Sequence, residues 1–422
     1  MSCKRVWKKL LGVEQVVVED WDFEEAARAL VVSVRASRKA ARRCPKCNKR
    51  CPIYDQGTGR KRCWRGLDLG TTRVFIKAAA PRIECRQHGV LVSTVPWARP
   101  GSAFTRDFED ETAWLTVHTT RKAVSELLRV AWRTVTHIVE AVGEEARSRV
   151  DLLDGLRRIG IDEVSYRKGQ KYLTVVVDHL SGRLVWMHPG RDAVTVGLFF
   201  EALGPERCER LDIVTADGAA WIEDAVRQYA PQALRCLDPF HVVQWATKAL
   251  DTVRRNVWND VRRAAEPEVA RQLKNARWAL WKNPEDLTPS QRETLGWIPK
   301  LNNSLYRAYL LKESLRGVFQ AKTVPKALSR LDAWIRWARR SRLGPFVKLA
   351  KTLALYRHRI ETTLRVGMSN AIVEARNTQI RLFTRMAHGF RCVQALINLA
   401  MLKLGGLCPP LPGRLPTHYT VT

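Results

Sequence analysis

The pattern of apolar and polar positions divides this chain of 422 residues into segments of different character. Short apolar runs rich in β-branched residues at Val16–Val18, 29–34 and Thr72–Ile76 predict strands in the first part. Residues 96–102 contain two prolines and a glycine, which indicates a linker. From residue 103 to residue 150 the spacing of apolar residues becomes that of helices.

Two short helical segments meet around Arg129 in this part of the chain. A tight turn between packed helices is typical of a helix-turn-helix, which we predict at about residues 106–142. The second helix would begin near Trp132 and expose donor-rich side chains suited to contacts in a DNA groove, namely Arg133, Thr134, Thr136 and His137. An ordinary helical hairpin between two domains would give the same pattern.

Strand and helix signals alternate between residues 156 and 238. The predicted elements are, in order, strands at 158–165, 172–178 and 183–187, a helix at 192–203, a strand at 211–216, a helix at 219–229 and a strand at 233–237. This order predicts a mixed α/β sheet. By analogy of fold alone, it matches the ribonuclease-H-like fold.

Residues 240–365 are rich in Arg, Leu, Ala and Trp and carry a helical pattern almost throughout. Prolines and a glycine divide this stretch into about five predicted helices, and Ser290–Glu293 has the sequence of a capping box. We expect most of its tryptophans to pack in a bundle, although exposed ones would stack on bases. Four prolines follow Cys408, so residues 408–422 are expected to form an extended tail.

Charge and composition narrow the class of protein. The chain has 72 Lys and Arg against 42 Asp and Glu, a net charge of +30 that is spread along its length. A charge of this size repels itself unless a polyanion neutralises it, which favours nucleic acid as the partner over an anionic membrane. No apolar run reaches the roughly 20 residues that span a bilayer, and no signal-peptide pattern is present. We therefore expect a cytoplasmic protein.

Cysteines gather in one short part of the chain. Cys44-Pro-Lys-Cys47 and Cys85-Arg-Gln-His88 each offer two ligands from one turn, and together they would hold a structural Zn²⁺. Basic residues around the first pair would stabilise thiolates. Cys51 and Cys63 lie in the same segment, and either could replace one of the four ligands. The alternative is a set of free buried cysteines.

Three acidic residues stand in settings of different kinds. Asp162 ends one apolar run, Asp217 ends another, and Glu374 lies where a helix is predicted to begin. Two aspartates at strand ends and one helical glutamate can bind two divalent metals of the kind that catalyse phosphoryl transfer, because Mg²⁺ prefers oxygen ligands. Strand alternation puts Asp162 on the face opposite Ile161, so we favour it over its neighbour Glu163.

Other residues of the same segments offer alternatives. Glu163, Asp178 and Asp212 are local competitors, and a single aspartate more often caps a strand end or a helix. Asp238-Pro-Phe-His241 directly follows the last predicted strand and would bring a carboxylate and an imidazole beside the metal site. A helix N-cap with a satisfied histidine would explain this pair equally well.

Together these motifs resemble insertion-sequence transposases of the ISL3 family, which use an Asp-Asp-Glu triad. The resemblance covers nearly the whole chain and rests on Cys44–Cys47, Ile161–Gly169, Asp238–Val243, Ser369–Asn377 and Arg385–Arg391. Ala371 and Ala375 stand where the family often has glycine, a departure that touches no expected ligand.

The resemblance implies a zinc-binding N-terminal domain, a helix-turn-helix and a ribonuclease-H-like core interrupted by an all-helical insertion. The expected domains are 1–98 (zinc-binding), 103–150 (helix-turn-helix), 156–240 (first part of the core), 241–365 (insertion), 366–407 (helices that complete the core) and 408–422 (tail). The resemblance assigns Asp162, Asp217 and Glu374 as ligands of two Mg²⁺ or Mn²⁺ ions.

We therefore expect a DNA transposase that binds terminal inverted repeats, hydrolyses the phosphodiester at the element's end and joins the freed 3′-OH to target DNA. No covalent protein–DNA intermediate is required, and pairing two ends implies at least a homodimer. Asp238 and His241 would be accessory residues. Basic residues of the insertion would hold the DNA backbone, among them Arg336, Arg339, Arg340 and Arg342. The alternatives are a regulator that binds DNA without catalysis, for which a degraded triad is expected, and a nuclease without strand transfer.

Overall fold

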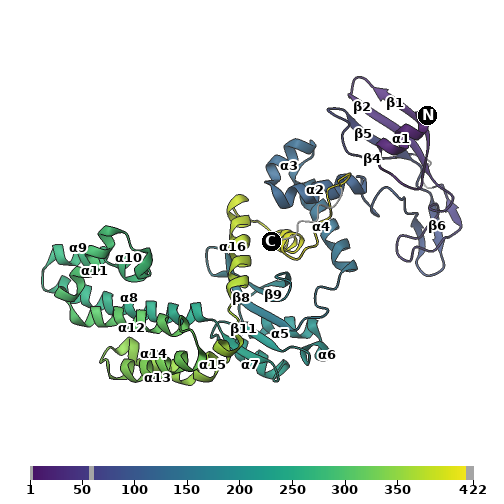
Figure 1. Ribbon diagram of the computed structural model, residues 1–422. Coiled ribbons are helices and arrows are strands. Elements are labelled where there is room, and N and C mark those ends of the chain that lie inside the picture. The colour runs from purple at the N-terminus through teal and green to yellow at the C-terminus, as the bar shows by residue number, and fades with distance from the viewer. Residues whose placement is uncertain (1–2, 57–60, 415–422) are drawn as a thin grey trace. The chain divides into compact units, whose positions relative to one another are not determined.

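The computed structural model describes residues 3–56 and 61–414. The chain forms two compact units, one made of Met1–Asp151 with Met386–Thr422 and the other of Leu152–Arg385. Figure 1 labels their elements. Each unit is described by itself.

The first unit begins with α1 (Cys3–Leu10) and a four-stranded sheet in the order β1-β2-β5-β4. Its strands are β1 (Val16–Glu24), β2 (Ala29–Ala36), β4 (Arg62–Arg65) and β5 (Arg73–Ala78). Three of them include the strands predicted from the apolar runs. A second sheet of three short strands comprises β3 (Ile53–Asp55), β6 (Arg82–Cys85) and β7 (Gly89–Val92).

The predicted linker at residues 96–102 has no helix or strand, but it is packed. Trp97 and Ala98 are buried in the core of the four-stranded sheet. Arg99 donates hydrogen bonds to Glu109, Asp110 and Glu145 at 2.9, 2.6 and 2.5 Å. Because three carboxylates surround one half-buried guanidinium, this segment is held firmly against the helices that follow.

Three helices follow, namely α2 (Arg106–His118), α3 (Arg121–Leu128) and α4 (Trp132–Arg149). Arg129 adopts a left-handed conformation (φ 54°) that ends α3, and α4 begins at Trp132, where the sequence predicted a helix start. From the other end of the chain, α17 (Val393–Leu404) packs on α4 and α2. Lys403 of α17 donates to the carbonyl of Val117 at 3.0 Å, which ties the C-terminal helix to the bundle.

The second unit contains a five-stranded sheet in the order β10-β9-β8-β11-β12. The strands are β8 (Arg158–Arg167), β9 (Lys171–Asp178), β10 (Leu184–Pro189), β11 (Ile213–Ala216) and β12 (Leu234–Leu237). β8, β9 and β10 are antiparallel, whereas β11 is parallel to both β8 and β12. The predicted mixed sheet and its element order are therefore confirmed.

Helices α5 (Ala193–Leu203) and α7 (Ala220–Tyr229) connect these strands, with the short α6 (Pro205–Cys208) between them. One face of the sheet buries Ile159, Ile161 and Val214 against Phe199 and Phe200 of α5. The sequence did not predict α6, which has only four residues. The opposite face of β8 is covered by α16 (Ala371–Met386), as Figure 1 shows.

Between β12 and α16 the chain is helical. The helices are α8 (Pro239–Arg263), α9 (Pro267–Asn275), α10 (Arg277–Trp281), α11 (Pro289–Leu301), α12 (Asn303–Phe319), α13 (Val324–Arg340), α14 (Gly344–Leu355) and α15 (Arg357–Val366). These are eight α-helices, with a short 3-10 helix (Pro284–Asp286) between α10 and α11, so the prediction of about five was wrong. Helices also end at Ala276 and Tyr356 without a proline, while Pro299 lies inside α11.

The predicted capping box was also wrong in position. Thr288 accepts from the backbone of Gln291, whose side chain accepts from the backbone of Thr288. The true box lies two residues earlier because Pro289 occupies the first turn, where its missing N–H costs nothing.

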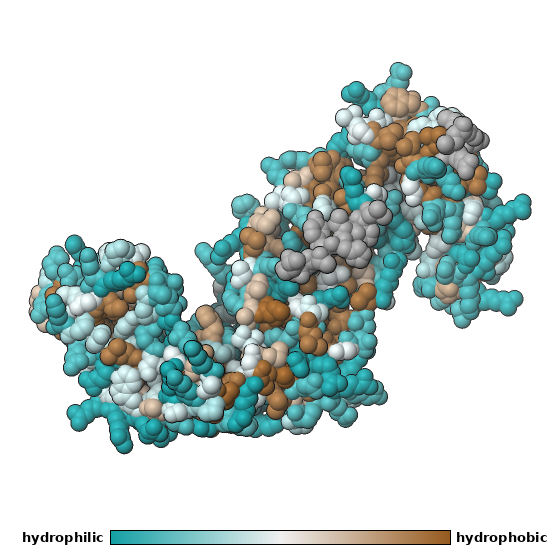
Figure 2. Space-filling model, in the orientation of Figure 1, coloured by the Kyte–Doolittle hydropathy of each residue, from teal (hydrophilic) through white to brown (hydrophobic). Residues whose placement is uncertain are grey.

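The core of this helical region includes the buried Trp334, as expected for most of its tryptophans. Trp278 and Trp337 are exposed. On the face drawn in Figure 2, hydrophilic residues cover much of the region. Within the described parts of the chain, no helix is long and apolar enough to cross a membrane. Residues 408–414 form neither helix nor strand, and the rest of the predicted tail lies outside the described residues.

Candidate active site and zinc site

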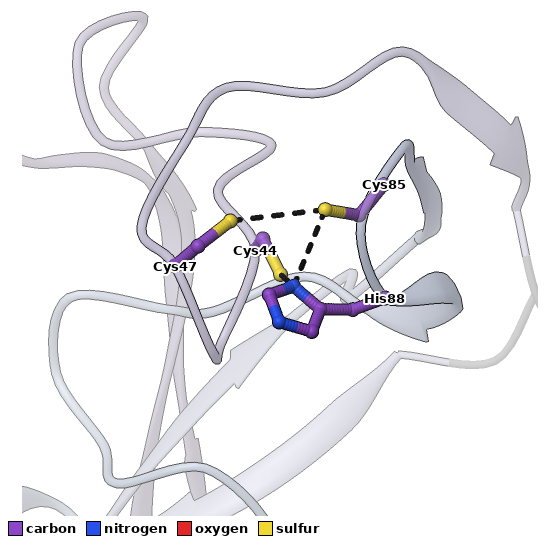
Figure 3. Close-up of side chains that lie close together, drawn as sticks. All are labelled: Cys44, Cys47, Cys85 and His88. Carbon is purple, nitrogen blue, oxygen red and sulfur yellow. Dashed lines mark hydrogen bonds between the residues drawn. The ribbon is translucent and has the colours of Figure 1, made fainter.

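The first unit brings together Cys44, Cys47, Cys85 and His88, whose ligand atoms all lie within 4.8 Å of one another. Figure 3 shows the four side chains converging from two turns. The first turn is closed by the Asn48 N–H, which donates to the Cys44 carbonyl at 2.9 Å. The second turn follows β6.

The distances between these atoms fit a tetrahedral zinc ion. Nδ1 of His88 lies 3.6 Å from Sγ of both Cys44 and Cys85, and Sγ of Cys47 lies 3.7 Å from Sγ of Cys85. Zn–S bonds of about 2.3 Å and Zn–N bonds of about 2.0 Å place tetrahedral ligand atoms roughly 3.5–3.8 Å apart. Backbone N–H groups of Gln87 and His88 point at the Cys85 sulfur and lower the pKa of that thiol to about 7, against the effect of burial, which favours a metal-binding thiolate.

The two other cysteines of the segment lie outside this group of four. Cys51 is buried beside it, and its thiol donates to the carbonyl of Lys49 at 3.4 Å. Cys63 is exposed on β4, in the other sheet. The geometry therefore favours the set of two pairs over a set that includes either of these residues.

The second unit places Asp217 and Glu374 close enough to Asp162 for their charges to affect its pKa. Asp162 lies in β8, Asp217 directly follows the neighbouring strand β11, and Glu374 is in the first turn of α16. The pKa of Asp162 is raised to about 6, chiefly by burial, with smaller contributions from the charges of Asp217 and Glu374. A buried carboxylate with two further carboxylates near it suits a site for hard cations.

Asp162 is held by two donors. One carboxylate oxygen accepts from the backbone N–H of Glu163 at 2.8 Å, and the other accepts from Nδ2 of Asn377 at 2.9 Å. Asn377 is fully buried on the face of α16 that packs on the sheet. Both donors stabilise the ionised form, which a metal ligand requires.

Asp217 is held through the loop that carries it. Its carboxylate accepts from the N–H of Ala219 at 2.9 Å, and its carbonyl accepts from the buried guanidinium of Arg235 in β12. Gly218 is required here because a Cβ at that position would lie 2.8 Å from the ring of Trp245. Arg235 and α8 therefore both hold this loop in place.

Glu374 is more open than the two aspartates. Its carboxylate pairs with Nη1 of Arg381, two turns later on α16, at 2.9 Å, and its side chain is about half exposed. The start of α16 approaches β8 closely because Gly160 lacks a side chain. A Cβ there would lie 2.4 Å from Cγ2 of Val373.

The predicted accessory pair is formed. Nδ1 of His241 lies 2.9 Å from the carboxylate of Asp238, which also caps α8 by accepting from the N–H of Phe240. Burial alone would lower the pKa of His241, but Asp238, Asp162 and Asp217 together raise it. Asp238 therefore caps α8 and, with His241, also lies beside the carboxylates.

The competing acidic residues differ in their surroundings. Asp178 accepts from the backbone of Leu180 and Ser181, and Asp212 forms an exposed ion pair with Arg157, so both have structural partners. Glu163 is different: burial and, to a smaller extent, the charge of Asp217 raise its pKa to about 7, and Arg191 lies 3.4 Å away.

The predicted DNA-contacting side chains lie near the start of α4 and on α13. Arg133 and His137 are exposed on α4, whereas Thr134 and Thr136 are half-buried. Thr136 accepts a hydrogen bond from Arg121 and donates to the Trp132 carbonyl, so its hydroxyl is engaged within the bundle. On and just after α13, four predicted arginines are exposed, namely Arg336, Arg339, Arg340 and Arg342.

Several residues around the carboxylates were not singled out from the sequence. They are Gly160, Arg235, Asn370, Asn377 and Arg381. The only signal available was spacing, because Asn370, Asn377 and Arg381 stand four before, three after and seven after Glu374, within reach of one helix face.

Comparison with known proteins agrees with this geometry. Three family models match: an ISL3 transposase model at residues 159–400, the helix-turn-helix domain of transposase family ISL3 at 93–143, and the zinc-finger of transposases IS204/IS1001/IS1096/IS1165 at 40–88. Together with the cysteine and histidine cluster, the last match supports a structural zinc site.

Whole-length relatives agree as well. The chain is 50% identical, over 97% of both sequences, to the transposase for insertion sequence element IS1557 in two strains of Mycobacterium tuberculosis. It is 27% identical to the transposase for IS1001 of Bordetella parapertussis, over 90% of this chain and 92% of that protein. The chain therefore belongs to the ISL3 family of insertion-sequence transposases.

Proposed function

We propose that the chain cuts and joins DNA at the ends of its insertion sequence, with Asp162, Asp217 and Glu374 as the catalytic carboxylates. The observation that carries this proposal is that Asp217 and Glu374, from two other segments of the chain, lie close enough to the buried Asp162 to contribute to raising its pKa, which is about 6. The supporting context is the transposase family model, of the Asp-Asp-Glu type, which spans all three residues.

The sheet and the helices around these carboxylates support a ribonuclease-H-like core. Three antiparallel strands are followed by two that continue the sheet in parallel. Asp162 lies in β8, and Asp217 directly follows the adjacent β11. In this proposal α8 to α15 are an insertion between the second aspartate and the glutamate. After this insertion the chain would come back to the sheet, where α16 packs beside β8.

The chemistry of the donor set suits two Mg²⁺ or Mn²⁺ ions, because all three groups offer carboxylate oxygens, although among the described residues only the cysteine and histidine cluster already brings its ligand atoms together. Bound divalent cations would supply Lewis-acid stabilisation of the attacking and leaving oxygens of phosphoryl transfer. Two donors favour the ionised form of Asp162 against the burial that raises its pKa. Arg235 supports the loop that carries Asp217, and Glu374 would have to exchange its ion pair with Arg381 for the metal ion to serve as a ligand. Asp238 would orient His241 toward the site as an accessory group.

The basic residues outside the carboxylate site suit the binding of DNA, which such an enzyme must hold. The start of α4 would read the terminal inverted repeats through Arg133 and His137, with Thr134 and Thr136 at its edge. The zinc site of Cys44, Cys47, Cys85 and His88 would stabilise the N-terminal module. Arg336, Arg339 and Arg340 would contact phosphates, and two such complexes would pair the two ends of the element on nucleoid DNA in the cytoplasm.

A cleavage assay on a labelled duplex that carries the element's terminal repeat tests this proposal. Wild-type protein should cut the repeat end only with Mg²⁺ or Mn²⁺, and Asp217→Asn should bind the duplex without cutting it. Specific binding by a wild-type protein that cuts under no metal condition would favour the regulator, and cutting without joined products would favour the nuclease.

A further inference from the structure

A single buried residue, Asn370, contacts four parts of the second unit. Its Nδ2 donates to the carbonyl of Ile161 at 3.3 Å, and its Oδ1 accepts from the hydroxyl of Thr215 at 2.5 Å. Its backbone N–H donates to Asp238 at 3.4 Å, and its carbonyl accepts from the N–H of Glu374 at 2.9 Å. Asn370 is only 2% exposed, so each of these bonds is shielded from water.

These contacts join the three elements that carry the catalytic carboxylates. Ile161 precedes Asp162 in β8, Thr215 lies in β11 two residues before Asp217, and Glu374 is four residues along the chain from Asn370. We propose that Asn370 is a positioning residue that sets Glu374 relative to Asp162 and Asp217. This inference rests on the proposed function of the three carboxylates.

The hydrogen-bond chain fixes how the Asn370 amide is oriented. His179 contacts the Thr215 hydroxyl through Nε2 at 2.7 Å. If His179 donates to Thr215, the hydroxyl donates in turn to Oδ1 of Asn370, and Nδ2 is left facing the Ile161 carbonyl. The reversed amide would set two carbonyl oxygens against each other, so only one orientation satisfies every group.

The same place is where helix and strand approach most closely. A Cβ on Gly160 would lie 2.4 Å from Val373, 2.9 Å from His179 and 3.0 Å from Oδ1 of Asn370. The start of α16 therefore has no room to move toward β8, and the Asn370 bonds prevent it from moving away. A shift of about 1 Å in a catalytic group costs on the order of 100-fold in rate, so such a constraint would matter for activity.

A pair of Thr215 variants isolates one arm of this network. Thr215→Val keeps the shape of the side chain but removes the hydroxyl, whereas Thr215→Ser keeps the hydroxyl. Asn370→Ala removes both side-chain bonds. Asn398→Ala is the matched control, because Asn398 is also 2% exposed and carries side-chain hydrogen bonds to Arg147 and Gln394, but it lies in the other unit.

Three readouts are needed: Mn²⁺ binding to the full chain by calorimetry without DNA, kcat for cutting a terminal-repeat duplex, and thermal unfolding. We expect Asn370→Ala and Thr215→Val to weaken Mn²⁺ binding by about 10- to 100-fold and to lower kcat, with the Kd for the duplex unchanged. Thr215→Ser should restore both the Mn²⁺ affinity and kcat, and Asn398→Ala should bind Mn²⁺ like the wild type.

Wild-type Mn²⁺ affinity and kcat in Thr215→Val and Asn370→Ala would overturn the proposal. So would a loss in Thr215→Val that Thr215→Ser fails to rescue, or equal losses in Asn398→Ala. If Asn370→Ala does not fold, the two Thr215 variants decide the question. Failure of the proposed function is distinct: there, Asp217→Asn would bind Mn²⁺ as tightly as the wild type.

Discussion

The side-chain amide of Asn377 donates a 2.9 Å hydrogen bond to the carboxylate of Asp162. Asn377 lies three residues after Glu374, so one helix supplies both a carboxylate and the group that holds a second carboxylate in the sheet. A bond to the ionised form favours that form, and it opposes the burial that raises the pKa of Asp162 to about 6.

Removal of this bond should shift the pH profile of catalysis. In Asn377→Leu, the pKa of Asp162 is expected to rise further, so the acid limb of the kcat profile moves to higher pH and kcat falls about 10- to 100-fold at neutral pH. The metal-free protein should lose stability at neutral pH, where the buried Asp162 is ionised without this donor, and change less near pH 5, because leucine has a similar volume and the Asn377 Oδ1 atom has no partner in the described structure. An unchanged acid limb would contradict this role for Asn377.

Divalent metal should stabilise the protein in a pH-dependent way. The folded-state pKa of Asp162 is raised from 3.8 to about 6, so its negative charge costs nothing below about pH 4, the metal-free protein loses stability as pH rises from about 4 to about 6, and the full cost is present above that. A bound cation removes that cost. We expect Mn²⁺ to add about 1–3 kcal/mol of stability near pH 7.5 and much less near pH 5, measured by denaturant unfolding.

Two variants control that measurement. Asp217→Asn should lose most of the Mn²⁺ effect, whereas Asp212→Asn should keep it, because Asp212 forms an exposed ion pair with Arg157 away from the site. Stabilisation that is equal at both pH values, or equal in the two variants, would mean that the metal binds elsewhere.

The zinc site should depend on Cys85 and be indifferent to Cys63. Purified wild-type protein is expected to contain one zinc ion per chain. Cys85→Ser should lose the metal and weaken binding to the terminal repeat, because a structural zinc site contributes folding free energy directly. Cys63→Ser is the control, since Cys63 is exposed in the other sheet. Full zinc content in Cys85→Ser, measured by metal analysis, would refute the ligand set.

The start of α4 should matter more for DNA recognition than its end. Arg133→Ala is expected to weaken binding to the terminal repeat by about 1–3 kcal/mol if Arg133 contacts a base, or to reduce the salt slope by about one if it contacts a phosphate. Arg149→Ala is a matched change on the same helix, where Arg149 is exposed and pairs with Glu145. Equal losses in both variants, measured by fluorescence anisotropy at several salt concentrations, would argue against groove recognition by this helix.

Much of the second unit's sheet could be predicted because its signals are local. Runs of apolar, β-branched residues mark β8, β9 and β11, and alternation puts Ile161 and Asp162 on opposite faces, as the structure does. The number of helices between β12 and α16 was underestimated because several helices end without a proline, at positions such as Ala276 and Tyr356. Those ends depend on packing between helices, which leaves little trace in the local sequence.

The buried amides around the site could not be predicted for a similar reason. Asn370 and Asn377 look like ordinary polar residues of an exposed helix, and only the close approach of α16 to Gly160 buries them. The zinc ligands also could not be chosen from the sequence, because spacing alone allows Cys51 to take the place of one of Cys44, Cys47 and Cys85. Contacts between segments far apart in the sequence decide which amides are buried and which cysteines lie together.

The most direct test of the account is metal-dependent cutting of a labelled duplex with the element's own terminal repeat, comparing wild type with Glu374→Gln. Glu374 is about half exposed, so the glutamine variant should fold and bind the duplex like the wild type. The account predicts a cut at the repeat end by the wild type alone, in Mg²⁺ or Mn²⁺ only. Equal cutting by Glu374→Gln, or cutting by the wild type in excess chelator, would contradict it.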